Sequence, residues 1–210
     1  AYLPALQNEF VWDDSVYIQN NPLIYTLDLP RIFSSYLAGN YHPLTVLVHA
    51  IEFKMFGLKP MGYHVVNMLI HVLNTALVFY FIRRLTANNF VAIATALFFG
   101  LHPMHVESVA WVSELKDVLY SFFFVAGLIA YLHFTEKKNA KWFVLTLLLF
   151  LLSILAKGMA VSFAVVLVLI DFYKGRLADK KVWLEKVPFF ILSFIFGIIC
   201  VRDRTMGNRS

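Results

Sequence analysis

Charged residues are scarce in this 210-residue sequence, because Asp, Glu, Lys and Arg together make up only 15% of it. Hydrophobic residues account for 60%, and the mean hydropathy is +0.70. Such a balance is not typical of a soluble domain and indicates an integral membrane protein. The aromatic content of 17% suits helices that face lipid and end at the level of the headgroups.

Cysteine is also nearly missing, since Cys200 is the only one in the sequence. A single cysteine forms no intramolecular disulfide, so cysteine usage indicates nothing about the redox compartment. The formal net charge of +5 comes from basic residues that gather in a few loops and not along one face. This distribution argues against nucleic acid as a partner and is typical of membrane topology signals.

Long apolar runs separated by basic loops predict an all-α fold, a polytopic transmembrane helix bundle with about six spans. The spans are expected at residues 63–82, 90–101, 118–134, 142–156, 159–173 and 187–201. The domain organisation that follows is an external loop at 1–62, the bundle at 63–201 and an irregular, truncated tail at 202–210. Within the external loop, Asp28 is the expected N-cap of a short helix that ends near Gly39, and the run 44–56 predicts an interfacial helix.

The basic loops predict the orientation of the bundle. Arg83 and Arg84, residues 137–141 and residues 174–186 fall on alternate loops, which the positive-inside rule places on the cytoplasmic side. The other loops then lie on the extracytoplasmic side. Three polar segments therefore share that side: the adjacent Asp13 and Asp14, the segment 102–117, and Lys157.

Asp13 and Asp14 lie in the stretch FVWDDSVYI, where aromatic and aliphatic neighbours would hold the loop at the membrane surface. Two carboxylates in a partly desolvated site have their pKa values pushed apart, so one remains an anion able to accept a proton from an incoming hydroxyl. The alternative interpretation is a solvated turn or a helix cap.

The stretch FGLHPMHVESVAWVSELKDVL, residues 99–119, holds the densest group of ionisable side chains between two apolar runs. Pro103 is expected to start a helix that places Glu107, Trp111 and Glu114 on one face, with Glu107 pointing into whatever Trp111 packs on. His102 and His105 would lie one turn apart. Their spacing is not that of an HExxH zinc motif, so hydrogen bonding of the loop or of a ligand is favoured over a bound metal.

Lys157 is the lone cation in a short external hairpin. It is interpreted either as a snorkelling lysine at a helix end or as a point charge for a phosphate, and Lys116 and Arg31 are further candidates for the second role. A polar stripe formed by His64, Asn67, His71 and Asn74 runs along the first span. Its spacing predicts a face turned toward protein, where interhelical hydrogen bonds explain it, and His64 is its best functional candidate.

In this order, the segments resemble one family. The matching segments are FVWDDSVYIQNN, YHPLTVLVHA, GYHVVNMLIHVLNTAL, LHPMHVESVAWVSELKDVL and LLSILAKGMAV, and the likeness covers most of residues 10–171. The sequence is similar to the polytopic GT-C-type glycosyltransferases that carry tetratricopeptide repeats behind their membrane domain. These include the transmembrane and tetratricopeptide O-mannosyltransferases and their bacterial relatives.

The resemblance implies inverting transfer of a sugar from a polyprenyl-phosphate carrier to a hydroxyl of a protein or glycan acceptor. The reaction would take place at the extracytoplasmic face of a bacterial inner membrane, among membrane lipids. In that family the first external loop carries the catalytic acidic residue, which maps onto Asp13 or Asp14 here. One of this pair is expected to act as the general base. Substrate contacts are expected from His102, His105, Glu107, His64, Lys157 and Lys116, with Lys157 at the carrier phosphate. Metal dependence varies among such enzymes, so a divalent cation stays open as a cofactor.

The sequence departs from the family pattern in three ways. A spanning helix is expected before the acidic loop, tetratricopeptide repeats are expected behind the membrane domain, and further spans are expected beyond residue 201. The chain is therefore expected to be a fragment. Two other functions stay open: a non-catalytic membrane scaffold for a repeat domain, and a transporter, which would place polar groups near the bilayer midplane.

Overall fold

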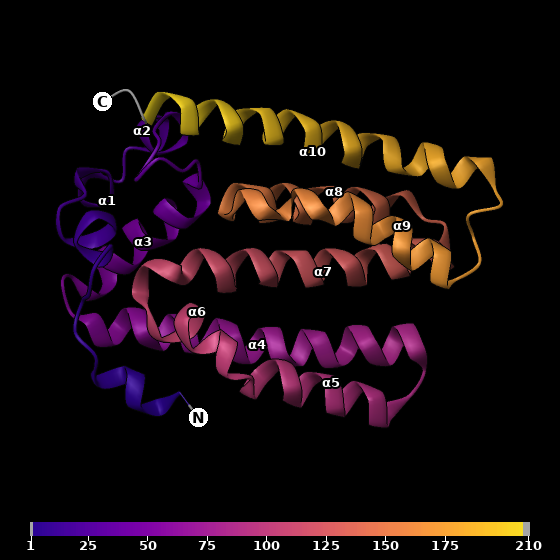
Figure 1. Ribbon diagram of the computed structural model, residues 1–210, viewed down its shortest axis with the longest axis horizontal. Coiled ribbons are helices and arrows are strands. Elements are labelled where there is room, and N and C mark those ends of the chain that lie inside the picture. Colours follow the sequence, from indigo (N-terminus) through magenta and orange to yellow (C-terminus); the bar gives the residue numbers. More distant parts are fainter. Residues whose placement is uncertain (1, 208–210) are drawn as a thin grey trace.

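The computed structural model describes residues 2–207, with side chains described as far as residue 200. Within residues 2–207 it contains helices and a single isolated bridge between Leu37 and Asn40, and no strand. Figure 1 shows long helices running side by side along one direction, with the N-terminal segment gathered across their left-hand end. The predicted all-α bundle is confirmed.

The long helices make up the bundle. They are α4 (Pro60–Thr86), α5 (Asn89–Leu101), α7 (Leu115–Lys137), α8 (Ala140–Ala156), α9 (Phe163–Tyr173) and α10 (Lys180–Gly207). α7 is central, since it packs against both α4 and α8, while α5 packs on α4 and α10 on α9.

Short elements occupy the left-hand end of the bundle in Figure 1. In the N-terminal segment these are η1 (Leu3–Gln7), η2 (Ser15–Gln19), α1 (Pro22–Thr26), α2 (Leu29–Ser34) and α3 (Pro43–Phe56). Between α5 and α7 come η3 (Pro103–His105), α6 (Val106–Ala110) and η4 (Val112–Glu114), and between α8 and α9 comes η5 (Gly158–Ser162).

All six apolar runs predicted as spans are helical, but they differ in length. Among the described residues, three helical segments are long and apolar enough to cross a membrane: Pro60–Thr86, Val112–Lys137 and Lys180–Cys200. A fourth crossing is formed if α5 and the segment Pro103–Ala110, which bend by 49°, act as one span. α8 and the segment Gly158–Tyr173 are apolar and shorter than these.

Several predicted boundaries can be compared with the structure. Asp28 does cap α2, since its Oδ1 accepts the backbone N–H of Arg31 at 3.2 Å. The helix ends at Ser34 rather than near Gly39, because Ser35 is already extended (φ −102°, ψ 152°). The expectation of an irregular tail from residue 202 is wrong as far as Gly207, where α10 is still helical; residues 208–210 of that tail lie outside the described residues.

Three apolar clusters hold these elements together, the smallest of them around Val109, Leu115 and Val118. Aromatic rings of α7, α8, α9 and α10 form the largest one, in which Phe150 stacks on Phe163 at 4.8 Å and Phe189 is fully buried. The second cluster fixes the N-terminal segment to α3 and α4 and includes Tyr17 and Tyr63. Burying a large side chain contributes about 1.5–3 kcal/mol, so the second cluster is sufficient to hold the external loop on the bundle.

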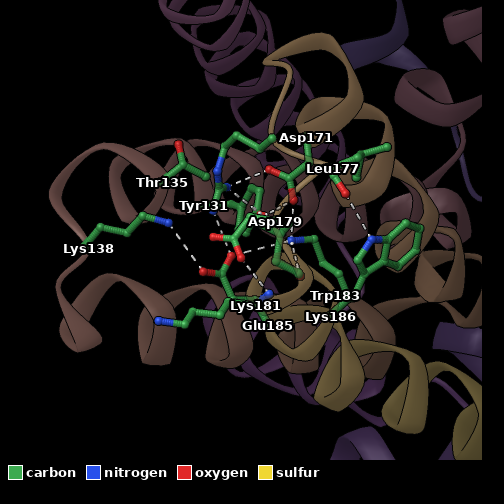
Figure 2. Close-up of polar contacts among 12 residues, drawn as sticks. Tyr131, Thr135, Lys138, Asp171, Leu177, Asp179, Lys181, Trp183, Glu185 and Lys186 are labelled. Atoms are coloured by element: carbon green, nitrogen blue, oxygen red, sulfur yellow. Dashed lines mark hydrogen bonds and ion pairs between the residues drawn. The ribbon is translucent and has the colours of Figure 1, made fainter.

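A buried polar network joins α7, α9 and α10 at the end of the bundle where the basic loops lie (Figure 2). The Lys186 ammonium, 2% exposed, forms a salt bridge with Asp171 and contacts the hydroxyl of Tyr131. Arg176 pairs with the other oxygen of Asp171 at 2.6 Å and with Glu185 at 2.9 Å. Since every charge in the network has an opposite partner, it serves to lock the three helices together.

Candidate functional site

Asp14 joins two parts of the chain that lie 99 residues apart. Its carboxylate is fully buried, with Oδ2 accepting the backbone N–H of Val11 at 3.0 Å and Oδ1 accepting that of Ser113 at 2.8 Å. The first external loop is thereby fixed against the segment 102–117. The two segments that the sequence predicts on one face are in direct contact.

Asp13 has different surroundings, although it is the next residue along the chain. It is exposed, and within the described residues its carboxylate makes no hydrogen bond or ion pair. Burial, with the negative charges of Asp13 and Glu114 added to it, raises the pKa of Tyr17 to about 12. The Asp13 carboxylate is therefore free for a ligand while remaining electrostatically coupled to Tyr17.

A network of charged side chains lies beside this loop. Lys157 forms an ion pair with Asp117 and lies 3.8 Å from Glu114, which in turn pairs with Lys116 at 2.8 Å. The second oxygen of Asp117 accepts the hydroxyl of Ser108 at 3.1 Å. Lys116 also lies over the ring of Tyr17, 4.9 Å from its centroid, which links the network to the acidic loop.

His42 is a buried neighbour of this network that sequence reasoning missed. Its ring stacks on Tyr17 at 5.3 Å, and its Nε2 is buried without a hydrogen-bond partner. Burial, reinforced by the charges of Lys116, His49 and Lys157, lowers the pKa of His42 to about 3. The imidazole is therefore neutral at physiological pH. The signal was its position directly before Pro43, at the start of a helix.

His49 and Glu52 form a second buried pair on α3. The distance from Nδ1 of His49 to Oε2 of Glu52 is 2.8 Å, and burial raises the pKa of Glu52. Nε2 of His49 and Oε1 of Glu52 are buried and have no partner. The spacing i, i+3 in a mostly apolar helix is the signal that sequence reasoning overlooked.

The two histidines of the segment 102–117 have different roles. Nδ1 of His102 accepts the backbone N–H of Met104 at 3.2 Å, which caps the following turn. His105 packs against Phe99 at 4.6 Å and His71 at 5.7 Å between ring centroids, and it makes no hydrogen bond within the described residues. Between residues 2 and 207, no group of three or more His, Cys, Asp or Glu side chains is arranged to hold a metal ion.

The predicted helix from Pro103 through Glu114 is interrupted, and the shared face predicted for its residues is wrong. Trp111 is extended (φ −101°, ψ 124°) and separates α6 from η4. Glu107 is consequently exposed and does not point under Trp111, whose ring packs on Trp12 at 5.3 Å. The break directs the N–H of Ser113 at Asp14, an interaction that a continuous helix would prevent.

The polar stripe of α4 faces protein, as the sequence predicts. All four of its members are at most 4% exposed. Each bonds a backbone carbonyl of another segment: His64 that of Asn8, Asn67 that of Trp111, His71 that of Gly100 and Asn74 that of Val118. His64 therefore holds the N-terminal segment against α4. The other three residues hold the break at Trp111, α5 and α7 against the same helix.

The remaining cationic candidate, Arg31, lies outside the network of charges. It is exposed and pairs with Asp28 at 3.3 Å. Lys116 and Lys157, in contrast, share Glu114 as an ion-pair partner. Asp14 bonds the backbone of Ser113, the residue before Glu114. A polar cavity of about 230 Å³ adjoins the network of charges through Asp117, and an apolar groove of about 530 Å³ lies between α4 and α5.

Comparison with known proteins identifies similar sequences. Residues 29–201 match the family model described as dolichyl-phosphate-mannose-protein mannosyltransferase. A protein O-mannosyl-transferase of Caenorhabditis elegans is 32% identical over 191 residues, covering 83% of this chain and 27% of the relative. The protein O-mannosyl-transferase TMTC3 of Homo sapiens is 30% identical, covering 73% of this chain and 18% of its own.

The protein O-mannosyl-transferase Tmtc1 of Drosophila melanogaster is 32% identical, covering 77% of this chain and 20% of the relative. The chain thus spans about a quarter or less of the length of these relatives. No solved structure is significantly similar to it.

Proposed function

The chain belongs to the dolichyl-phosphate-mannose-protein mannosyltransferase family, and on that basis we propose that the protein containing it transfers mannose from a polyprenyl-phosphate carrier to an acceptor hydroxyl. The acceptor is a protein or a glycan, and the reaction takes place on the extracytoplasmic side of the membrane. The basic loops at the opposite end of the bundle support this orientation.

The observation that carries the proposal is the convergence of acidic and basic groups at one end of the bundle. Asp14 bonds Ser113 at 2.8 Å, and Lys157 bonds Asp117, so three segments distant in sequence form one surface. A transfer that removes a proton and releases a phosphate needs a base and a cation in the same place. A scaffold has no requirement for an unpaired carboxylate beside such a cluster.

Asp13 is the proposed general base. Its exposed carboxylate takes the proton of the acceptor hydroxyl while the hydroxyl oxygen attacks the anomeric carbon of the donor sugar. The bond from that carbon to the phosphate oxygen breaks, and polyprenyl phosphate leaves with both electrons, so the configuration at carbon is inverted. Asp14 has both oxygens occupied by backbone N–H groups and positions Asp13.

Lys157, supported by Lys116, is the proposed contact for the carrier phosphate. Its ammonium has three N–H donors, of which one bonds Asp117, while Glu114 lies 3.8 Å away, and its side chain is 22% exposed. A phosphate that reaches this ammonium gains a charge-assisted hydrogen bond as negative charge develops on the leaving group.

The test is sugar transfer in vitro by the full-length protein, using dolichyl-phosphate-mannose as donor. Asp13→Asn is expected to lower kcat by about 10²–10⁴-fold, which is the usual contribution of a general base. Asp28→Asn is the matched control, because asparagine caps a helix as well as aspartate does. Unchanged turnover of Asp13→Asn would overturn the base assignment, and no transfer by the wild type would favour the scaffold.

A further inference from the structure

The polar cavity beside the charged network lies between α4, α5, α6 and α7. It encloses about 230 Å³, and the residues that matter for its chemistry are His71, Asn74, Phe99, His105, Ser108 and Asp117. At ~30 Å³ per water molecule the cavity has room for about seven waters. This volume matches one sugar ring and is too small for a nucleotide.

One of the residues that line the cavity has a buried polar atom without a partner. Asn74 is 1% exposed and donates its amide N–H to the carbonyl of Val118 at 2.8 Å, which leaves its Oδ1 buried without a partner. A buried acceptor without a donor costs about 1–3 kcal/mol, so a ligand that donates to it is stabilised. His105 also lines the cavity, and its ring makes no hydrogen bond within the part of the chain described.

The charges around the cavity decide the class of ligand. Asp117 lines the wall, so an anion such as phosphate would meet a carboxylate. Metal ions are disfavoured too, since residues 2–207 contain no group of three suitable ligands. What remains is an uncharged molecule with several hydroxyl groups, each able both to donate and to accept.

The mixture of surfaces also suits a carbohydrate. Ser108, Ser121 and Asn74 contribute polar side chains to its lining, and Phe99 contributes an apolar ring. A pocket lined by hydrophobic and aromatic groups, with a few polar groups that fix orientation, is the usual form of a small-molecule site. A pyranose has both kinds of surface, carbon-bound hydrogens on its faces and hydroxyls at its edge.

We propose that this cavity binds the sugar ring of the carrier-linked donor, with Lys157, which bonds Asp117 of the cavity wall, facing the phosphate; the inference rests on the proposed function. Lys157 bonds Oδ1 of Asp117, whose other oxygen accepts the hydroxyl of Ser108. Asp117 is thus the wall shared by the cavity and the charged network. A sugar in the cavity places its anomeric phosphate toward the cation, and the cavity defines which hexose is accepted.

The test is binding of methyl α-mannoside to the full-length protein, measured by ligand-observed saturation-transfer NMR. Ser121→Leu fills the cavity without removing a hydrogen bond, and His105→Phe keeps the ring packed on Phe99 while removing its nitrogens. Each variant is expected to bind methyl α-mannoside at least about tenfold more weakly. Ser121→Leu excludes the ligand sterically, and His105→Phe removes one hydrogen bond to it. Ser35→Leu is the control, at a half-buried serine outside the cavity whose side chain, like that of Ser121, makes no hydrogen bond within the described residues.

Displacement of methyl α-mannoside by a short-chain dolichyl-phosphate-mannose analogue completes the test. The proposal is supported if the analogue displaces the mannoside and both cavity variants lose binding. It is overturned if the wild type binds no mannoside, if the variants bind as the wild type does, or if the analogue does not displace the mannoside. Because binding is measured without turnover, failure here and failure of mannose transfer are separate results.

Discussion

At the scale of single residues, Asp13 and Asp14 show how the fold gives two identical side chains different surroundings. Asp14→Asn keeps one carbonyl oxygen for one of the two backbone N–H groups and turns an amide N–H₂ toward the other. The loss is expected to be about 1–3 kcal/mol of unfolding free energy. Asp13→Asn, at an exposed position, should change stability by less than about 0.5 kcal/mol.

Thermal unfolding of both variants in detergent measures this difference. We expect a clearly lower midpoint for Asp14→Asn and a wild-type midpoint for Asp13→Asn. Equal midpoints would mean that Asp14 does not fix the external loop to Ser113.

His42 makes the stability of the fold decrease as the pH is lowered. Its folded pKa of about 3 lies below the ordinary value of 6.5, so between these values the unfolded chain binds the extra proton. The contribution of His42 to the unfolding free energy is fully present above pH 6.5. It falls by about 1.4 kcal/mol for each pH unit below that value. His42→Gln should remove that dependence.

The measurement compares unfolding free energies of wild type and His42→Gln at pH 7.5 and 5.5. The difference between the two proteins should change by about 1.4 kcal/mol over this interval. His102→Gln is the control, since that histidine is half-buried and caps a turn. Parallel curves for wild type and His42→Gln would contradict the burial of a neutral imidazole.

At the scale of elements, the buried polar network of Figure 2 links α7, α9 and α10. Lys186→Met leaves Asp171 buried with only Arg176 and Tyr131 as partners, and should destabilise the protein by about 3–5 kcal/mol. The double variant Asp171→Asn, Lys186→Met removes the stranded charge and should recover part of this loss. Lys138→Met, at an exposed ion pair with Glu185, should cost about 0–1 kcal/mol.

Chemical denaturation in mixed micelles measures the unfolding free energy of the three variants. We expect Lys186→Met to be the least stable of them. If Lys138→Met were as harmful as Lys186→Met, the surface pairs and not the buried pair would hold α9 to α10.

Sequence reasoning succeeds where periodicity and composition determine the element. The apolar runs predict the helices, and the spacing of His64, Asn67, His71 and Asn74 predicts a face turned to protein, because one face of a helix repeats every three to four residues. The break at Trp111 was missed, since no proline or glycine marks it. Contacts from other segments stabilise it, namely Asp14 to Ser113 and Asn67 to the carbonyl of Trp111.

The same limit applies to the candidate site. Alternating basic loops are enough to predict that Asp13, Asp14 and Lys157 share one end. They say nothing of the partners of Lys157, because its ion pairs with Asp117 and Glu114 depend on how α7 packs against α8. His42 was missed for a related reason: its burial against Tyr17 depends on tertiary packing of the external loop.

At the scale of the whole molecule, the two ends of the bundle differ in how well their polar groups are paired. Charges at the end with the basic loops have opposite partners in the network of Lys186. Within the described residues, one buried polar atom without a partner, Arg84 Nε, lies at that end as well. The others occur at or toward the opposite end: His42 Nε2, His49 Nε2, Glu52 Oε1, His64 Nδ1, Asn67 Oδ1, Asn74 Oδ1, Trp111 Nε1 and Ser113 Oγ. Unsatisfied groups are costly, and their concentration there is typical of a functional site.

The central claim is that the acidic loop, the segment 102–117 and the hairpin at Lys157 form one extracytoplasmic surface. Its most direct test is labelling of intact cells with a membrane-impermeant thiol reagent, using single cysteines in a Cys200→Ser background. Asp13→Cys, Glu107→Cys and Met159→Cys, all at exposed positions, should be labelled from outside, and Lys137→Cys only after permeabilisation. Labelling of Asp13→Cys and Met159→Cys from opposite sides would show that the acidic loop and the hairpin at Lys157 do not share one surface.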